Sequence, residues 1–176
     1  MNAESISVVG LGNLGQTLAT CLAWRGFDVL GIDVSESVLA SLAAGRATIV
    51  EPRVQEMLDT AGGRLQVTTD HRRAIDETET TLILVATPSE KDGSFSTAFL
   101  ESALESLGRA LAEAGKRDHL FVVGSTVSPG AMERMSRVLE TASGRKLNQG
   151  FLLCYCPELV ALCLLYTSDA ADDLTR

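Results

Sequence analysis

Three glycines near the N-terminus have the spacing of a phosphate-binding turn. Gly10, Gly12 and Gly15 follow the β-branched pair Val8-Val9 and are followed by a helical pattern. In such a strand–turn–helix unit the first glycine permits the tight turn, the second lets the backbone approach a pyrophosphate, and the third lets helix and strand pack closely. N–H groups and the dipole at the helix N-terminus favour a bound phosphate. The residues expected to hold a dinucleotide are therefore Gly10, Leu11, Gly12, Asn13, Leu14 and Gly15.

A carboxylate stands where the adenosine ribose of that dinucleotide would lie. Asp33 ends a second apolar run that begins at Val29, and it lies 21 residues beyond Gly12. This spacing is typical of the acidic residue that hydrogen-bonds the ribose hydroxyls of NAD. Because Asp33 would repel a 2′-phosphate, the sequence favours NAD over NADP. The alternative is that Asp33 only caps the next helix.

Composition and charge restrict the partners. The chain has 176 residues and 45% hydrophobic content, which is enough for one domain with a buried core. A net charge of −8 argues against nucleic acid or an anionic membrane as a partner. No apolar run approaches the roughly 20 residues of a membrane span, and the first residues are not a basic signal region. We therefore expect a cytoplasmic protein.

The cysteines and histidines do not have the spacing of a metal site. None of the four cysteines belongs to a Cys-x-x-Cys pair, and the two histidines are isolated. Cys154 and Cys156 share one face of a predicted strand, where buried thiols are expected. His71 and His119 are expected at the surface or at helix ends. No metal is predicted.

Apolar patterns predict six strands that alternate with helices. The predicted strands span 6–9, 27–33, 64–69, 81–86, 119–123 and 151–156. The predicted helices are 14–24, a segment that Ser35 caps and Gly45 ends, a short helix with Pro52 in its first turn, 72–76, 99–114 and 131–141. This alternation predicts an α/β fold, a Rossmann-like doubly wound parallel sheet of about six strands.

Polar residues follow several of these strands. In an open parallel sheet ligands bind at the carboxyl ends of the strands, and the ends here carry Asp33, Thr87-Pro88, Ser125-Thr126 and Glu158. As a set on one rim they predict a cofactor crevice. The alternative interpretation is that each of these polar residues only forms a turn or caps a helix.

The chain resembles the nucleotide-sugar 6-dehydrogenases, the family of UDP-glucose, UDP-N-acetylmannosamine and GDP-mannose dehydrogenases. The resemblance covers residues 5 to about 160. It is carried by Val-Val-Gly-Leu-Gly-Asn-Leu-Gly, Ile32-Asp33, Ile49-Val50-Glu51-Pro52, Val85-Ala86-Thr87-Pro88, Gly124-Ser125-Thr126-Val127-Ser128-Pro129-Gly130 and Cys156-Pro157-Glu158. One departure is Val38, which stands where family members usually have a basic residue.

The resemblance implies an activity and roles for single residues. These relatives oxidise the C6 alcohol of a nucleotide sugar twice, to the carboxylate, with two NAD and a cysteine nucleophile. It implies that Thr87-Pro88 and Ser125 belong to the cofactor site, with Thr87 and Ser125 near the nicotinamide. Thr126 would position a water or the reacting oxygen, and Glu158 would act in acid/base or water-activating chemistry. A nucleotide sugar is then the expected partner, in a homodimer.

The C-terminal residues differ in kind from the rest. The run from Cys163 to Asp172 looks like a translated sequencing adapter, so we expect an NAD-binding domain over 1–162 and a non-native tail over 163–176. A genuine polar tail is the alternative. On the first expectation the sheet is truncated before a middle helix and a second domain that carries the nucleophile, and the chain is an inactive N-terminal part of the enzyme.

Two other functions remain open from the sequence. A β-hydroxyacid dehydrogenase relative would share the opening strand–helix–strand unit, although it accounts less well for Ser125-Thr126 and Pro157-Glu158. A non-catalytic NAD-binding module is the other. The continuation of the reading frame in an unbroken copy of the gene would discriminate among the three.

Overall fold

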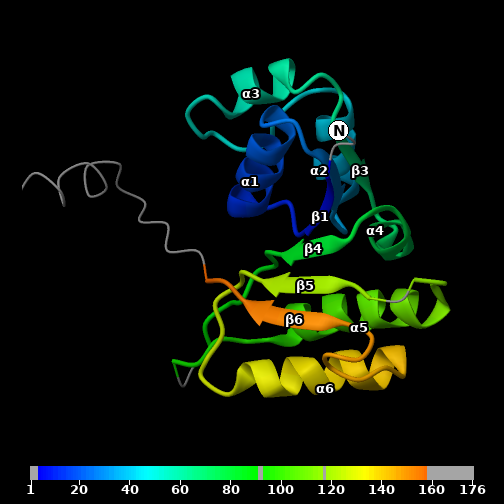
Figure 1. The fold of residues 1–176 in the computed structure, drawn as a ribbon. Helices are drawn as coiled ribbons and strands as arrows, with labels where there is room; N and C mark the ends of the chain where they lie inside the picture. The colour runs from blue at the N-terminus through cyan, green and yellow to red at the C-terminus, as the bar shows by residue number, and fades with distance from the viewer. Residues whose placement is uncertain (1–3, 91–92, 117, 158–176) are drawn as a thin grey trace, which may run out of the picture.

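A single parallel sheet organises the computed structural model, which describes residues 4–90, 93–116 and 118–157. The strands are β1 (Ser5–Val9), β2 (Asp28–Ile32), β3 (Leu65–Thr68), β4 (Thr80–Ile83), β5 (Leu120–Val123) and β6 (Leu152–Tyr155). Their order is β3-β2-β1-β4-β5-β6, and each neighbouring pair is parallel (Figure 1). This confirms the doubly wound fold, in which the chain changes direction between β1 and β4.

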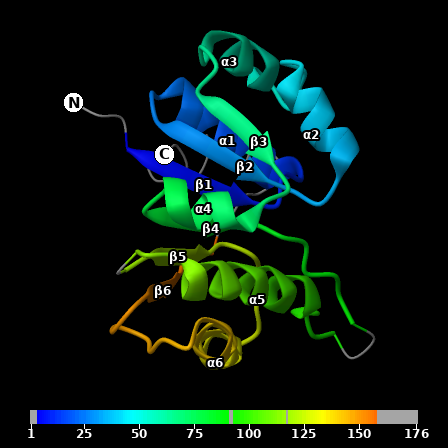
Figure 2. The same cartoon turned by 90° about the vertical axis from the view of Figure 1, so that its right-hand side faces the viewer.

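Helices cover the sheet on both faces. They are α1 (Asn13–Trp24), α2 (Glu36–Ala43), α3 (Val54–Thr60), α4 (His71–Glu77), α5 (Ala98–Glu113) and α6 (Ala131–Ser143). Neighbouring residues of β1 enter different cores: Val8 packs with residues of α1, and Val9 with residues of α4, α5 and α6. Figure 2 shows α5 and α6 packed beside each other on the second face. The alternating side chains of a strand thus serve two cores.

The helices begin close to the positions predicted from the sequence, except at one proline. Ser35 caps α2 as predicted, and its Oγ accepts a hydrogen bond of 3.4 Å from the Val38 N–H. The prediction for Pro52 is wrong, because the helix begins only at Val54. Arg53 between them has a left-handed backbone with φ of 65°, so it turns the chain before α3.

The sixth strand lies at the edge of the sheet. The prediction that Cys154 and Cys156 are buried is wrong, since both thiols are exposed. Leu153, which precedes Cys154, packs toward the core that contains α6, so by the alternation of a strand the two cysteines point to the opposite face. An outermost strand has a neighbour on one side only, which leaves these side chains in solvent.

The prediction for His119 is also wrong, because its side chain is only 2% exposed. It lies just before the inner strand β5, and its Nε2 is 2.7 Å from Thr81 Oγ1. Thr81 Oγ1 is in turn 2.7 Å from Ser7 Oγ. Burial, and secondarily the charge of Lys116, lowers the pKa of His119 to about 3. A neutral imidazole is therefore part of this buried polar cluster.

Candidate functional site

A different structural feature explains the presence of glycine at each of the three positions of the turn. Gly10 has φ of 90°, and a Cβ there would lie 2.7 Å from the Leu84 carbonyl oxygen. A Cβ on Gly15 would lie 1.8 Å from the Gly10 carbonyl oxygen, so α1 could not pack so close to the turn. A Cβ on Gly12 would meet nothing within 4 Å. The chain therefore leaves open space beside Gly12, where a phosphate would approach the N-terminus of α1.

The Asp33 carboxylate faces this turn. Its Oδ2 accepts a hydrogen bond of 2.6 Å from the Leu11 N–H, and its Oδ1 accepts one of 2.8 Å from the Ser35 N–H. The N-cap of α2 is Ser35, so capping does not account for Asp33. Each carboxylate oxygen has a second lone pair, so Asp33 can still accept hydrogen bonds from ribose hydroxyls.

A pocket of about 440 Å³ lies where the chain changes direction between β1 and β4. Its volume is within the range of small-molecule sites. The turn contributes Gly10 and Gly12, and Asp33 stands in the same wall. The other lining residues are Val9, Ile32, Val34, His71, Leu84, Val85, Ala86, Phe99, Ser102, Ala103 and Ser106. The structure thus brings the glycine turn and Asp33, which the sequence predicts to bind the pyrophosphate and the ribose, together in one concave site.

The residues predicted on the nicotinamide side do not line this pocket. Ser125 is buried, and its Oγ donates a hydrogen bond of 2.7 Å to the Val85 carbonyl oxygen. That contact joins the ends of β4 and β5. Thr87 is half-buried, Pro88 and Thr126 are exposed, and Glu158 lies outside the described residues.

Sequence reasoning missed the helical wall of the pocket. His71 begins α4, and α5 contributes Phe99, Ser102, Ala103 and Ser106. The α5 residues recur at the spacing of one helix face. That spacing is the signal in the sequence that could have indicated this wall.

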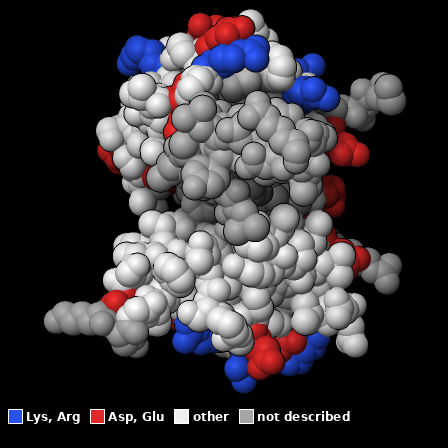
Figure 3. All heavy atoms as spheres, turned by 90° about the vertical axis from the view of Figure 1, so that its left-hand side faces the viewer, with Lys and Arg blue, Asp and Glu red and all other residues white. Residues whose placement is uncertain are grey.

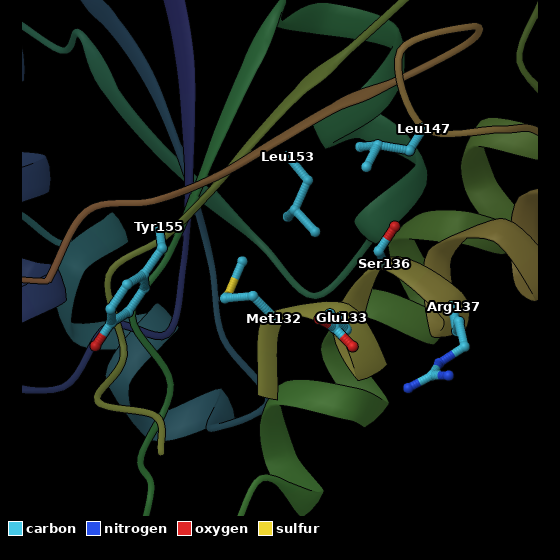
Figure 4. Close-up of a pocket in the computed structure, with 7 residues that line it drawn as sticks. All are labelled: Met132, Glu133, Ser136, Arg137, Leu147, Leu153 and Tyr155. Atoms are coloured by element: carbon cyan, nitrogen blue, oxygen red, sulfur yellow. The ribbon is translucent and has the colours of Figure 1, made fainter. Parts of the chain in front are cut away.

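A second hollow lies away from these residues, between α6 and β6 (Figure 4). It measures about 450 Å³, and Leu147, Leu153 and Met132 line it together with Tyr155. None of the residues predicted for the cofactor lines it. The pocket beside Gly12 is therefore the candidate site.

Figure 3 views the face toward which the strands run, and the Lys, Arg, Asp and Glu side chains visible on it lie mainly toward the periphery. At a helix N-terminus the backbone N–H groups can themselves bind a pyrophosphate.

Two features are absent from the part of the chain that the structure describes. Within 4–90, 93–116 and 118–157 there is no helix with the length and apolar character needed to cross a membrane. In the same part of the chain no three His, Cys, Asp or Glu residues are grouped so that they could bind a metal ion.

Known proteins share both the sequence and the fold. Residues 4–165 match the family described as the UDP-glucose/GDP-mannose dehydrogenase family, NAD binding domain. GDP-mannose 6-dehydrogenase of Pseudomonas syringae pv. tomato is 38% identical over 158 residues, which are 88% of this chain and 36% of that protein. UDP-glucose 6-dehydrogenase AglM of Haloferax volcanii is also 38% identical, with the same coverage.

Solved structures give the same picture. A ternary complex of GDP-mannose dehydrogenase from Pseudomonas aeruginosa superposes with a TM-score of 0.85 at 34% identity, over 89% of this chain and 36% of that one. A 3-hydroxyisobutyrate dehydrogenase of Mycobacterium tuberculosis has a TM-score of 0.56 at 17% identity over 88% of this chain and 40% of that one, a likeness of fold alone.

The chain spans about 36% of the length of the curated relatives it matches. The matched portion is the NAD binding domain of these NAD-dependent oxidoreductases, so NAD is the cofactor of this family domain. From its glycine turn, its aspartate and its matched length, this chain belongs to the UDP-glucose/GDP-mannose dehydrogenase family through its NAD binding domain.

Proposed function

We propose that the glycine turn and Asp33 together bind the adenosine diphosphate half of NAD. The pyrophosphate lies on the N–H groups from Gly12 to Gly15, while the Leu11 N–H donates to Asp33, and the adenosine ribose donates its hydroxyls to Asp33. The single observation that carries this proposal is the 2.6 Å hydrogen bond between the Leu11 N–H and Asp33 Oδ2. It places the carboxylate beside the turn, so one ligand can contact both.

The nicotinamide half extends along the same edge of the sheet toward β5. NAD supplies a hydride acceptor there when it is bound. Thr87-Pro88 and Ser125 form that end of the site, and the Ser125 hydrogen bond to Val85 fixes the distance between the strand ends. Thr126 is exposed and free to orient a water or a substrate oxygen. Glu158 is included in this proposal only because it belongs to the Cys156-Pro157-Glu158 motif.

The substrate of the whole protein is a nucleotide sugar whose C6 alcohol is oxidised to the carboxylate. The relatives named as GDP-mannose and UDP-glucose 6-dehydrogenases support this choice. A homodimer, a cytoplasmic location, a domain over 1–162 and a non-native tail over 163–176 belong to the same proposal. Analytical sedimentation of the full-length protein tests whether it has the mass of a homodimer.

Titration with the two nicotinamide dinucleotides tests the cofactor site. The chain should bind NAD at least tenfold more tightly than NADP, because the 2′-phosphate would meet the Asp33 carboxylate. Asp33→Asn should weaken NAD binding roughly tenfold and reduce the preference, since it removes a charge-assisted hydrogen bond.

Asp28→Asn is the matched control. Asp28 begins the strand that precedes Asp33, and its exposed carboxylate pairs with Arg64 at 2.8 Å. An exposed pair of this kind contributes little to stability, so this variant should bind both dinucleotides as the wild type does. Equal affinity of the wild type for NAD and NADP would refute the assignment of Asp33.

A further inference from the structure

Two thiols stand on one face of the edge strand, outside the candidate site. Cys154 belongs to β6, and Cys156 is the residue after its end. The Cys156 N–H still donates a hydrogen bond of 2.9 Å to the Val123 carbonyl oxygen, so the chain stays in the ladder with β5 as far as this residue. The alternation of a strand therefore continues, and both sulfurs leave the backbone on the same side of the sheet.

These thiols lie on the face of the sheet that α1 and α2 cover elsewhere. Leu153 packs with the core of α6 on the other face, and Cys154 beside it points away from that core. Helices α1 and α2 pack against β1, β2 and β3, whereas β5 and β6 lie at the other end of the sheet (Figure 1). Both thiols are exposed, so an ion in solvent can reach them.

The groups next to the two thiols do not compete for them. Among the described residues, neither sulfur makes a hydrogen bond or a disulfide. Val122 is the partner of Cys154 on β5, and Gly124 follows at the level of Cys156. A Cβ on Gly124 would lie 2.5 Å from a methyl group of Leu84, so that leucine fills the place of a side chain. The surroundings on β5 are therefore apolar.

The spacing of the two cysteines determines which chemistry they can perform. Residues two apart in a strand are about 6.6 Å apart, with side chains that point in the same direction. A disulfide needs Cβ atoms roughly 3.5–4.5 Å apart, so the backbone would have to move before these sulfurs could bond to each other. An ion between two sulfurs spans a longer distance than an S–S bond. The pair is therefore better suited to holding one ion than to forming a disulfide.

The two sulfurs are also close enough for their charges to interact. Partial burial, and secondarily the charge of Cys156, raises the pKa of the Cys154 thiol. A cation between two thiolates removes this repulsion, because each sulfur then faces a positive charge.

The number of ligands restricts the kind of cation. Thiolates are soft ligands that select ions such as Cu(I) and zinc. Zinc sites in proteins are almost always four-coordinate, and the described residues hold no group of three His, Cys, Asp or Glu that could bind a metal. Cu(I) accepts two sulfur ligands on opposite sides, which matches two thiols on one strand face.

We propose that Cys154 and Cys156 together bind a soft monovalent cation of the Cu(I) class. Each thiol loses its proton as its sulfur binds the ion, and no electron is transferred. Neither cysteine lines the pocket beside Gly12. This site is therefore separate from the cofactor pocket and does not depend on the proposed function.

Competition with the Cu(I) chelator bicinchoninate, in an oxygen-free buffer without thiols, tests the proposal. The reference protein is the 176-residue chain with Cys163→Ser, because Cys163 lies outside the described residues and would add another thiol. It should take one equivalent of Cu(I) from the chelator. Cys154→Ser and Cys156→Ser should each weaken Cu(I) binding by at least roughly a hundredfold, more than the loss of an outer-shell partner usually costs.

Cys21→Ser is the matched control. Its sulfur lies on α1 and contacts Met57 Sδ at 3.8 Å, so it is the other thiol beside a second sulfur in the described part of the chain. This variant should bind Cu(I) as the reference protein does. Reference affinity in either serine variant of β6, or loss of binding in Cys21→Ser, would refute the proposal.

Thermal unfolding gives a second readout that separates a folded site from a sequence that binds Cu(I) in any conformation. One equivalent of Cu(I) should raise the melting temperature of the reference protein, because the strand holds both sulfurs in place only in the folded chain. The melting temperature of Cys154→Ser should not change. Binding without any rise in the melting temperature of the reference protein would refute a site built by β6.

Discussion

Asp33 Oδ2 accepts a hydrogen bond of 2.6 Å from the Leu11 N–H, which joins the end of β2 to the turn that follows β1. The contact links two segments that belong to different strands of the sheet. It places the carboxylate beside the glycine turn, next to the N–H groups that we propose bind the pyrophosphate. A substitution at Asp33 or in the turn should therefore change the affinity of the protein for the same ligand.

Gly15→Ala should destabilise the fold. The added Cβ would lie 1.8 Å from the Gly10 carbonyl oxygen, so α1 would have to move away from the turn. Overpacking of this kind costs about 1–3 kcal/mol or more. Urea unfolding measures the loss, and Gly115→Ala is the control because a Cβ there meets nothing within 4 Å. An unchanged midpoint for Gly15→Ala would show that the turn is not so tightly packed.

Gly12→Ala should separate binding from stability. A Cβ at this position meets nothing within 4 Å, so the unfolding midpoint should stay close to that of the wild type. The methyl group would instead occupy the space through which the backbone approaches the pyrophosphate. NAD affinity, measured by titration, should fall at least tenfold. Wild-type affinity in this variant would place the phosphates elsewhere.

Acid should destabilise the protein through His119. Its pKa is about 3 in the folded chain and near 6.5 when unfolded, so between these values the unfolded chain binds more protons. This contribution is fully present above pH 6.5 and is lost as the pH falls, by about 1.4 kcal/mol per pH unit until about pH 3.

Unfolding free energies of the wild type and His119→Gln, measured from pH 7 to 4, isolate this contribution. The variant should lack the part of the slope that comes from the imidazole. Identical slopes for the two proteins would mean that His119 is accessible to protons in the folded chain.

Ser125→Ala should lower stability by about 1 kcal/mol, because the Val85 carbonyl oxygen would lose its 2.7 Å hydrogen bond from Ser125 Oγ. Thr126→Ala is the matched control, since the Thr126 side chain is exposed on the same loop. Thermal unfolding of the two variants makes the comparison. Equal melting temperatures would argue that the Ser125 hydroxyl does not join the two strand ends.

The sequence was sufficient wherever one local pattern determines the structure. The spacing of Gly10, Gly12 and Gly15 indicates the turn, and the six apolar runs indicate the parallel sheet. The position of Asp33 beside the turn follows directly from the strand that ends before it, and its role toward the ribose stays a prediction.

The wrong predictions depended on contacts between distant segments. His119 is buried because Thr81 and Phe121 surround it, which no local pattern shows. Cys154 and Cys156 are exposed because their strand has a single neighbour in the sheet. His71 reaches the pocket only because α4 begins beside the end of β2.

Calorimetric titration of the folded 176-residue chain with NAD tests the central claim most directly. The account predicts a saturable heat from one site, reduced when Asp33 is replaced by Asn. A folded sample that gives no heat with NAD would contradict it.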